Sequence, residues 1–97
     1  KRSEPRVPFG TLIEQGLLTP GQTLFDQRRR FTARISADGS ITSKKLRGSI
    51  HKVGAHVQDA PACNGWTFWH FERAGKTVSI DELRQKIRAD MSPVRGR

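Results

Sequence analysis

Asn64-Gly65-Trp66-Thr67-Phe68-Trp69-His70-Phe71 is the stretch that decides the fold. It holds both tryptophans and two of the five phenylalanines of an otherwise polar, basic chain. Asn-Gly is a strong turn signal because both residues tolerate positive φ angles, and aromatic residues are enriched in β-strands. We therefore expect a strand over residues 66–71. Strand side chains alternate, so both faces carry large rings, which predicts a central strand with the core on one side and a covering helix or a ligand on the other.

Helices and a hairpin are expected before this stretch. Residues 8–16 place apolar side chains on one helical face, and a glycine is suited to end that helix. Residues 29–45 alternate apolar and polar side chains around Asp38-Gly39, which predicts a β-hairpin. Ser49 is a suitable N-cap for a further helix that ends near Gln58.

The register of the hairpin depends on its loop. A two-residue loop would pair Ile35 with Thr42. A three-residue loop with Gly39 in the left-handed region pairs Ile35 with Ile41 and Arg34 with Thr42 instead. The second register keeps one face apolar, so we expect it, with a basic opposite face.

After the aromatic stretch, residues 77–78 predict a short strand. The capping box at residues 79–82 then opens a helix, and the composition becomes tail-like from Ala89. The order α-β-β-α-β-β-α predicts a small single α+β domain of antiparallel hairpins packed with about three short helices. The expected organisation is a linker at residues 1–7, the domain at residues 8–90 and a flexible basic tail at residues 91–97.

Composition points to a polyanionic partner. The 97 residues are 34% hydrophobic and carry a formal charge of +9. Of this charge, +7 falls within residues 28–52, where Asp38 is the single acidic residue. Such a block is typical of a nucleic-acid footprint, although an ordinary solvated face is the simpler alternative.

The cysteine count and the absence of long apolar segments indicate the cellular compartment of the protein. Cys63 is the only cysteine, so an internal disulfide is impossible, and a reducing, cytoplasmic setting is expected. Neither a membrane span nor a signal peptide is recognisable, so no membrane partner is expected. The chain lacks an initiator Met, and its abrupt start suggests a domain excised from a larger protein.

Catalytic and metal sites are not expected. His51 and His56 are five residues apart and do not share a helical face as an i, i+4 metal pair would. Cys63 with His70 as a base lacks a residue to orient it, and a lone small cysteine is more often a packing residue. Phosphate-binding glycine motifs are absent, so we expect no catalytic, cofactor-binding or metal-binding residue in this fragment.

Several features favour nucleic-acid binding instead. Ser49 at a helix N-terminus, followed by Lys52, offers free N–H groups, a hydroxyl and a cation to a phosphate. Asn64 can pair with adenine, although an Asn before Gly is more often a turn residue. Either Trp66 or Trp69 can stack on an unpaired base, while core packing claims at least one of the two rings.

The segments Gly48-Ser49-Ile50-His51-Lys52-Val53-Gly54-Ala55 and Ala60-Pro61-Ala62-Cys63-Asn64-Gly65-Trp66-Thr67-Phe68-Trp69-His70 resemble a known family. They are similar to the restriction-adenine-methylase-associated (RAMA) domain, in particular at the C-terminus of the cell-cycle-regulated bacterial DNA adenine methyltransferases. The resemblance extends from about Val7 through Asp90. It implies a non-catalytic DNA-binding appendage of an enzyme that methylates adenine N6 in GANTC sites with S-adenosylmethionine. The catalytic DPPY-type and FxGxG motifs of such enzymes are absent here.

The resemblance also implies site residues. In the family, the serine of GSIHK and the asparagine and first tryptophan of NGW are tied to DNA binding, which favours Trp66 over Trp69 as the ligand-facing ring. The full set of expected DNA-binding residues is Ser49, Asn64, Trp66, Lys52, His51, Arg28, Arg29, Arg30, Lys44, Lys45 and Arg47. Alternatives are a module that dimerises or docks onto the catalytic methyltransferase domain of the same chain, and an RNA-binding domain.

Overall fold

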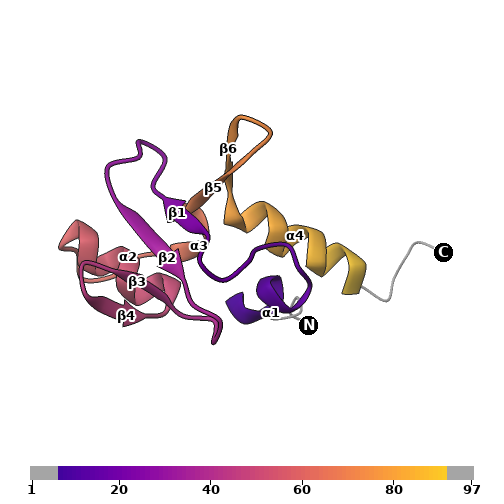
Figure 1. Cartoon of the computed structure of the whole chain (residues 1–97), viewed down its shortest axis with the longest axis horizontal. Coiled ribbons are helices and arrows are strands. Elements are labelled where there is room, and N and C mark those ends of the chain that lie inside the picture. Colours follow the sequence, from indigo (N-terminus) through magenta and orange to yellow (C-terminus); the bar gives the residue numbers. More distant parts are fainter. Residues whose placement is uncertain (1–6, 92–97) are drawn as a thin grey trace, which may run out of the picture.

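The computed structural model describes residues 7–91. Apart from Val7 and Met91, the expected linker and tail lie outside these residues. Within that range the predicted α+β class is confirmed, with six strands in one antiparallel sheet and four helices packed against it (Figure 1). The helices are α1 (Phe9–Glu14), α2 (Ile50–Gln58), α3 (Gly65–Phe68) and α4 (Ile80–Met91). The strands are β1 (Thr23–Phe25), β2 (Thr32–Ile35), β3 (Ile41–Ser43), β4 (Leu46–Gly48), β5 (His70–Arg73) and β6 (Lys76–Ser79).

The sheet has the order β4-β3-β2-β1-β5-β6. β1, which the sequence did not reveal, lies between β2 and β5 and so joins the two hairpins into one sheet. The β5–β6 hairpin projects away from the other strands beside α4 (Figure 1). No helix of residues 7–91 is long and apolar enough to cross a membrane.

The predicted β2–β3 register is confirmed. Ile35 pairs with Ile41 and Arg34 with Thr42, and Gly39 takes a φ of 90° in the connecting turn. β4 was not predicted because the turn before it is Lys44-Lys45. Both lysines have positive φ, a conformation that Asn and Gly adopt far more readily, so composition offers no turn signal there.

The predicted strand over residues 66–71 is wrong in its first half. Gly65–Phe68 form the short helix α3, and β5 begins only at His70. Asn64 caps α3: its side-chain oxygen accepts a hydrogen bond from the Trp66 N–H at 3.1 Å. Aromatic content favoured a strand, but this cap and the burial of two rings three residues apart, Trp66 and Trp69, determine a helical turn.

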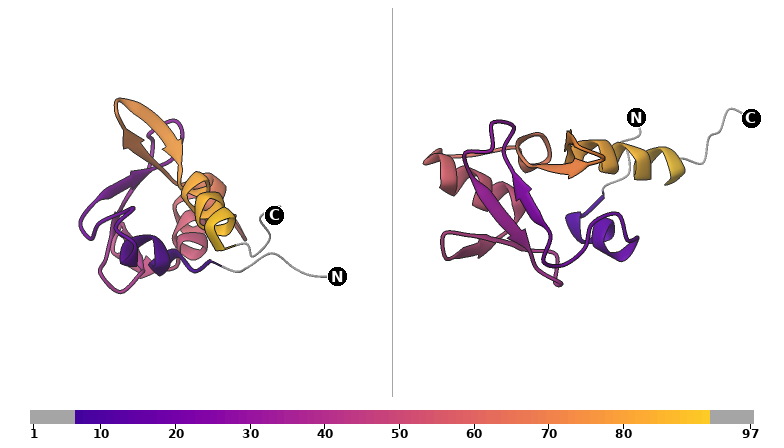
Figure 2. Two further views of the ribbon diagram at one scale, coloured as in Figure 1. Left: turned by 90° about the vertical axis from the view of Figure 1, so that its right-hand side faces the viewer. Right: turned by 45° about the horizontal axis from the view of Figure 1, so that its top comes forward.

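The core lies between the sheet and the helices. Trp69 is fully buried, and its indole N–H donates to the Ile50 carbonyl at 3.0 Å, which ties the aromatic segment to the start of α2. Val7, expected in the linker, is buried in the same core. α2 contacts β3 and β4, and Figure 2 shows the helices lying to one side of the strands. On the other side of β1–β4, Thr23, Thr32, Arg34 and Arg47 are exposed to solvent.

Candidate nucleic-acid interface

A cleft of about 1140 Å³ opens where the helices meet the β2–β3 turn. It collects side chains that are far apart in the sequence. Its lining residues are Val7, Pro8, Phe9, Gly10, Asp38, Gly39, Ser49, Ile50, His51, Asn64, Trp66, Arg84 and Arg88. The structure thus brings together four of the predicted site residues, Ser49, His51, Asn64 and Trp66.

The N-terminus of α2 forms one wall of this cleft. The Ser49 hydroxyl accepts a hydrogen bond from the Lys52 N–H at 3.0 Å, as predicted for an N-cap. The N–H groups of Ile50 and His51 precede the first intrahelical bond and have no carbonyl partner within the helix. They carry the positive end of the helix dipole, so this wall favours an anion.

His51 links α2 to α3. Its Nδ1 accepts a hydrogen bond from the Gly65 N–H at 2.9 Å, so the ring proton of this arrangement is on Nε2. The residue is otherwise exposed and lines the cleft. His51 therefore has a structural contact through one nitrogen and leaves the other as a hydrogen-bond donor.

Trp66 forms the floor of the cleft and is only 6% exposed. Its ring packs edge-on against Phe9, with centroids 6.2 Å apart, and the Arg84 guanidinium carbon lies 4.7 Å from the ring centre. Arg84 also contacts Asp81 in an ion pair of 2.5 Å. A base can stack on this ring only if Arg84 moves away.

Sequence reasoning missed Arg84 and Arg88. Both lie on α4, four residues apart, and each follows a residue of the buried stripe, Leu83 and Ile87. Residues at i and i+4 share a helical face, so they lie together on the flank of α4 that borders the cleft. The i, i+4 spacing of the two arginines is visible in the sequence.

The basic block itself lies elsewhere. Arg28, Arg29 and Arg30 follow β1, and Lys44 and Lys45 form the β3–β4 turn; none of these five lines the cleft. The structure therefore does not bring the whole predicted site together in the cleft.

Some of the predicted phosphate ligands already have carboxylate partners. Arg29 lies 3.7 Å from Glu72, and Arg30 pairs with Asp26. Arg47 pairs with Asp38 at 2.5 Å and also donates to the Ser40 hydroxyl. Hydrogen bonds from Ser40 and the Arg47 guanidinium lower the pKa of Asp38 to about 2. The described residues include no acidic partner for Arg28, Lys44, Lys45 or Lys52.

The sequence is similar to known proteins. The family "Restriction Enzyme Adenine Methylase Associated" (RAMA) matches residues 1–93. The chain is 35% identical over 80 residues to the Type II methyltransferase M.HinfI of Haemophilus influenzae, a match that covers 82% of this chain. The same match covers 22% of that methyltransferase, so the chain spans about a fifth of this relative. With the family match over nearly its whole length, the chain belongs to the RAMA family of domains associated with adenine methylases.

Proposed function

We propose that this chain is a non-catalytic DNA-binding domain of a DNA adenine N6-methyltransferase, and that the cleft holds the DNA backbone near a GANTC target. The observation that carries the proposal is the convergence of Ser49, Asn64 and Trp66 with two arginines of α4 on one cleft. In the full enzyme, another part of the chain would bind S-adenosylmethionine and transfer the methyl group.

The chemistry of the cleft suits a phosphodiester. The α2 N-terminus supplies backbone N–H donors and a hydroxyl, and Arg84 supplies a guanidinium that is mostly enclosed by protein. The Nε of Arg84 has no hydrogen-bond partner among the described residues although it is buried. The one carboxylate on the rim, Asp38, is paired with Arg47 and so repels an incoming anion less.

Trp66 has a more limited role in this proposal than free stacking. Because Phe9 and Arg84 cover its ring, it shapes the floor and positions the arginine. Contact with a base or sugar would follow from movement of Arg84 toward a phosphate. A methyltransferase must take its adenine out of the stack, at a cost of a few kcal/mol. A domain that grips the neighbouring backbone offsets part of that cost.

The decisive variant is Ser49→Asp. Aspartate is as good an N-cap as serine, and its charge suits a helix N-terminus, so the free energy of unfolding stays the same or rises. The same carboxylate repels a phosphate in the cleft. We expect duplex affinity to fall at least about tenfold, a factor that about 1.4 kcal/mol of repulsion produces. Fluorescence anisotropy with labelled GANTC and scrambled duplexes over a salt series measures it.

The matched control is Thr19→Asp, which adds the same charge at an exposed turn residue that does not line the cleft. We expect it to lower affinity much less. If Ser49→Asp and Thr19→Asp behave alike, Ser49 is only a cap and the cleft is not the DNA site. The docking alternative would then be favoured, in which the cleft contacts the catalytic domain or a second copy of the chain.

A further inference from the structure

The solvent face of the β1–β4 part of the sheet is a second polar and basic surface. Four side chains form a row across it, because their residues are cross-strand partners in register. Thr23 on β1 pairs with Arg34 on β2, which pairs with Thr42 on β3, which pairs with Arg47 on β4. Apolar partners of the same strands, such as Ala33 and Ile35, point the other way into the core.

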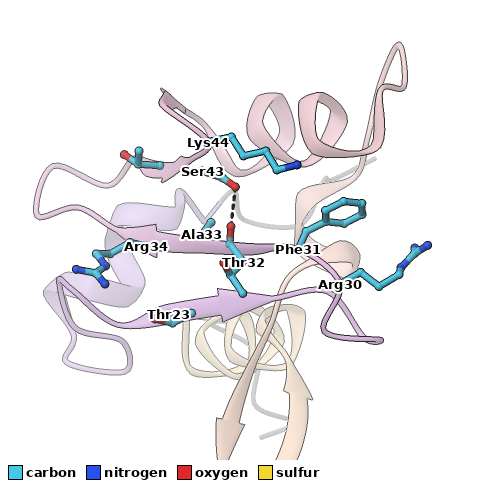
Figure 3. A pocket seen from close by; sticks show the side chains of 9 residues that line it. Thr23, Arg30, Phe31, Thr32, Ala33, Arg34, Ser43 and Lys44 are labelled. Atoms are coloured by element: carbon cyan, nitrogen blue, oxygen red, sulfur yellow. Dashed lines mark hydrogen bonds between the residues drawn. The ribbon is translucent and has the colours of Figure 1, made fainter.

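An aromatic ring lies at one end of this face. Phe31 is half-buried, and two cations flank its ring: the Arg30 guanidinium carbon is 5.3 Å and the Lys44 Nζ 5.7 Å from its centre. Figure 3 shows Arg30, Phe31 and Lys44 at one end of β2 and Arg34 at the other, with helices behind the strands. Together with Thr32 they line a hollow of about 330 Å³.

The charge of this face is not balanced. Arg34 and Lys44 have no carboxylate partner among the described residues. Arg30 is paired with Asp26, whose carboxylate is buried and does not reach the surface. No acidic residue lines the hollow. This surface therefore favours an anionic occupant.

The geometry points to a second binding site on this face, for an unpaired nucleic-acid strand whose phosphates contact Arg34 and Lys44, and one of whose bases packs on Phe31 once Lys44 has moved from the ring to a phosphate. A broad sheet with cations and a half-buried ring at its edge suits splayed bases, because every base has a π-face to stack. A duplex keeps its bases stacked inside and would leave the ring without a partner. The face lies across the sheet from α2, so this site does not depend on whether the cleft binds DNA.

The test is binding of a labelled oligothymidine to the 97-residue chain over a salt series. The double variant Arg34→Gln/Lys44→Asn removes two cations from the face, and asparagine suits the left-handed backbone at Lys44 (φ 50°), so the fold is retained or stabilised. We expect an affinity loss of at least about tenfold at low salt. The slope of log affinity against log salt should flatten by about 1.4, since each single-strand phosphate contact contributes about 0.7.

The matched control is Lys76→Gln/Lys86→Gln, which removes two exposed cations on β6 and α4 that do not line the hollow. It should lower affinity only slightly. Phe31→Leu keeps the site apolar and should cost roughly five- to a hundredfold in affinity with an unchanged salt slope. An oligothymidine carrying 5-iodouracil should photocrosslink to Phe31 in the unaltered protein, whatever the stability of the variants.

Equal losses in the two double variants would overturn the proposal, because net charge alone would explain them. Crosslinks found only in the cleft would also overturn it, as would failure of the oligothymidine to bind at low salt. If Ser49→Asp weakens duplex binding while the face variants still weaken oligothymidine binding as expected, that loss concerns the cleft and not this face.

Discussion

Asp26 is the residue on which the β1–β2 loop depends. Its side chain is 5% exposed, and Oδ1 accepts hydrogen bonds from the N–H groups of Arg30 and Phe31 at 2.5 and 2.8 Å. Burial alone raises the pKa of Asp26, but the N–H groups of Phe31, Arg30 and Arg28 outweigh burial and lower it. A carboxylate whose pKa is lower in the folded than in the unfolded chain stabilises the protein at pH values above its unfolded-state pKa, near 3.9. This contribution is lost as the pH falls through the folded-state pKa.

Asp26→Asn should therefore destabilise the domain by about 2 kcal/mol at pH 7, the usual worth of hydrogen bonds to a buried charge. The difference from the unaltered protein should shrink as pH falls below about 4, where the carboxyl group begins to protonate in the unfolded chain. Urea unfolding at pH 7 and at low pH measures both. Asp59→Asn is the control: this residue is exposed at the C-cap of α2 with a φ of 58°, which asparagine tolerates. Equal effects of the two variants would contradict the prediction.

At the residue scale, the sequence predicted some local structural roles correctly and others incorrectly. Ser49 was predicted as an N-cap, and the structure confirms it. Asn64 was predicted as a turn residue and instead caps a helix, a role that the same short polar side chain can fill. The sequence suggested that Gly65 is needed for a positive φ in a turn. In the structure, Gly65 is needed because it has no side chain. A Cβ there would lie 2.6 Å from the Ile50 carbonyl carbon and oxygen.

That close approach determines how α2 and α3 fit together. The Gly65 N–H bonds to His51 and the Trp69 indole bonds to Ile50, so the first turn of α2 contacts α3 at its first residue and at its C-cap. Backbone cannot give way as a flexible side chain can. The α2–α3 contact is therefore the element-scale feature that positions Ser49, His51 and Asn64 in one cleft.

Gly65→Ala should lower stability by about 2–3 kcal/mol, in the range for overpacking, even though alanine is the better helix former. Thermal unfolding followed by circular dichroism measures it. The control is Gly10→Ala in α1, where the added Cβ meets only Gly39 at an ordinary 3.9 Å, so stability should hold or rise by up to about 1 kcal/mol. If both glycines tolerate alanine equally, the two helices are not in the contact described.

Element prediction succeeded where local chemistry and pattern agreed. The β2–β3 hairpin combined alternation with Asp38-Gly39, and its register was predicted residue by residue. Element prediction failed where tertiary contacts determine the structure. β1 is only three residues long, and β4 follows a Lys44-Lys45 turn that has no turn signal in the sequence. α4 continues past Ala89 to Met91 because its stripe of buried residues continues to Ile87, against a polar composition.

On the scale of the whole molecule, the sheet separates the two candidate surfaces. The solvent face takes Arg30, Arg34, Lys44 and Arg47 from the charge block, while the cleft draws on α1, α2, α3, α4 and the β2–β3 turn. Charge counts alone could not separate the two surfaces. Lys44, Arg47 and Ser49 are close in sequence, although the first two lie on the solvent face of the sheet and Ser49 lines the cleft on its other side. What composition established correctly was the excess of +9, and only packing shows that it is distributed over more than one surface.

Two surfaces predict a specific response to a forked substrate, a duplex with one unpaired arm. Affinity for the fork should exceed that for either arm alone, because the second contact becomes intramolecular once the first has formed.

Ser49→Asp should weaken the duplex contact, and Arg34→Gln/Lys44→Asn should weaken the single-strand contact. Sites without shared partners add in free energy, so the combined variant should lose the product of the two separate factors. A combined loss well below that product would mean that one continuous surface binds both arms. Anisotropy with fork, duplex and oligothymidine, each over the same salt series, distinguishes these outcomes, because only the fork engages both faces of the sheet at once.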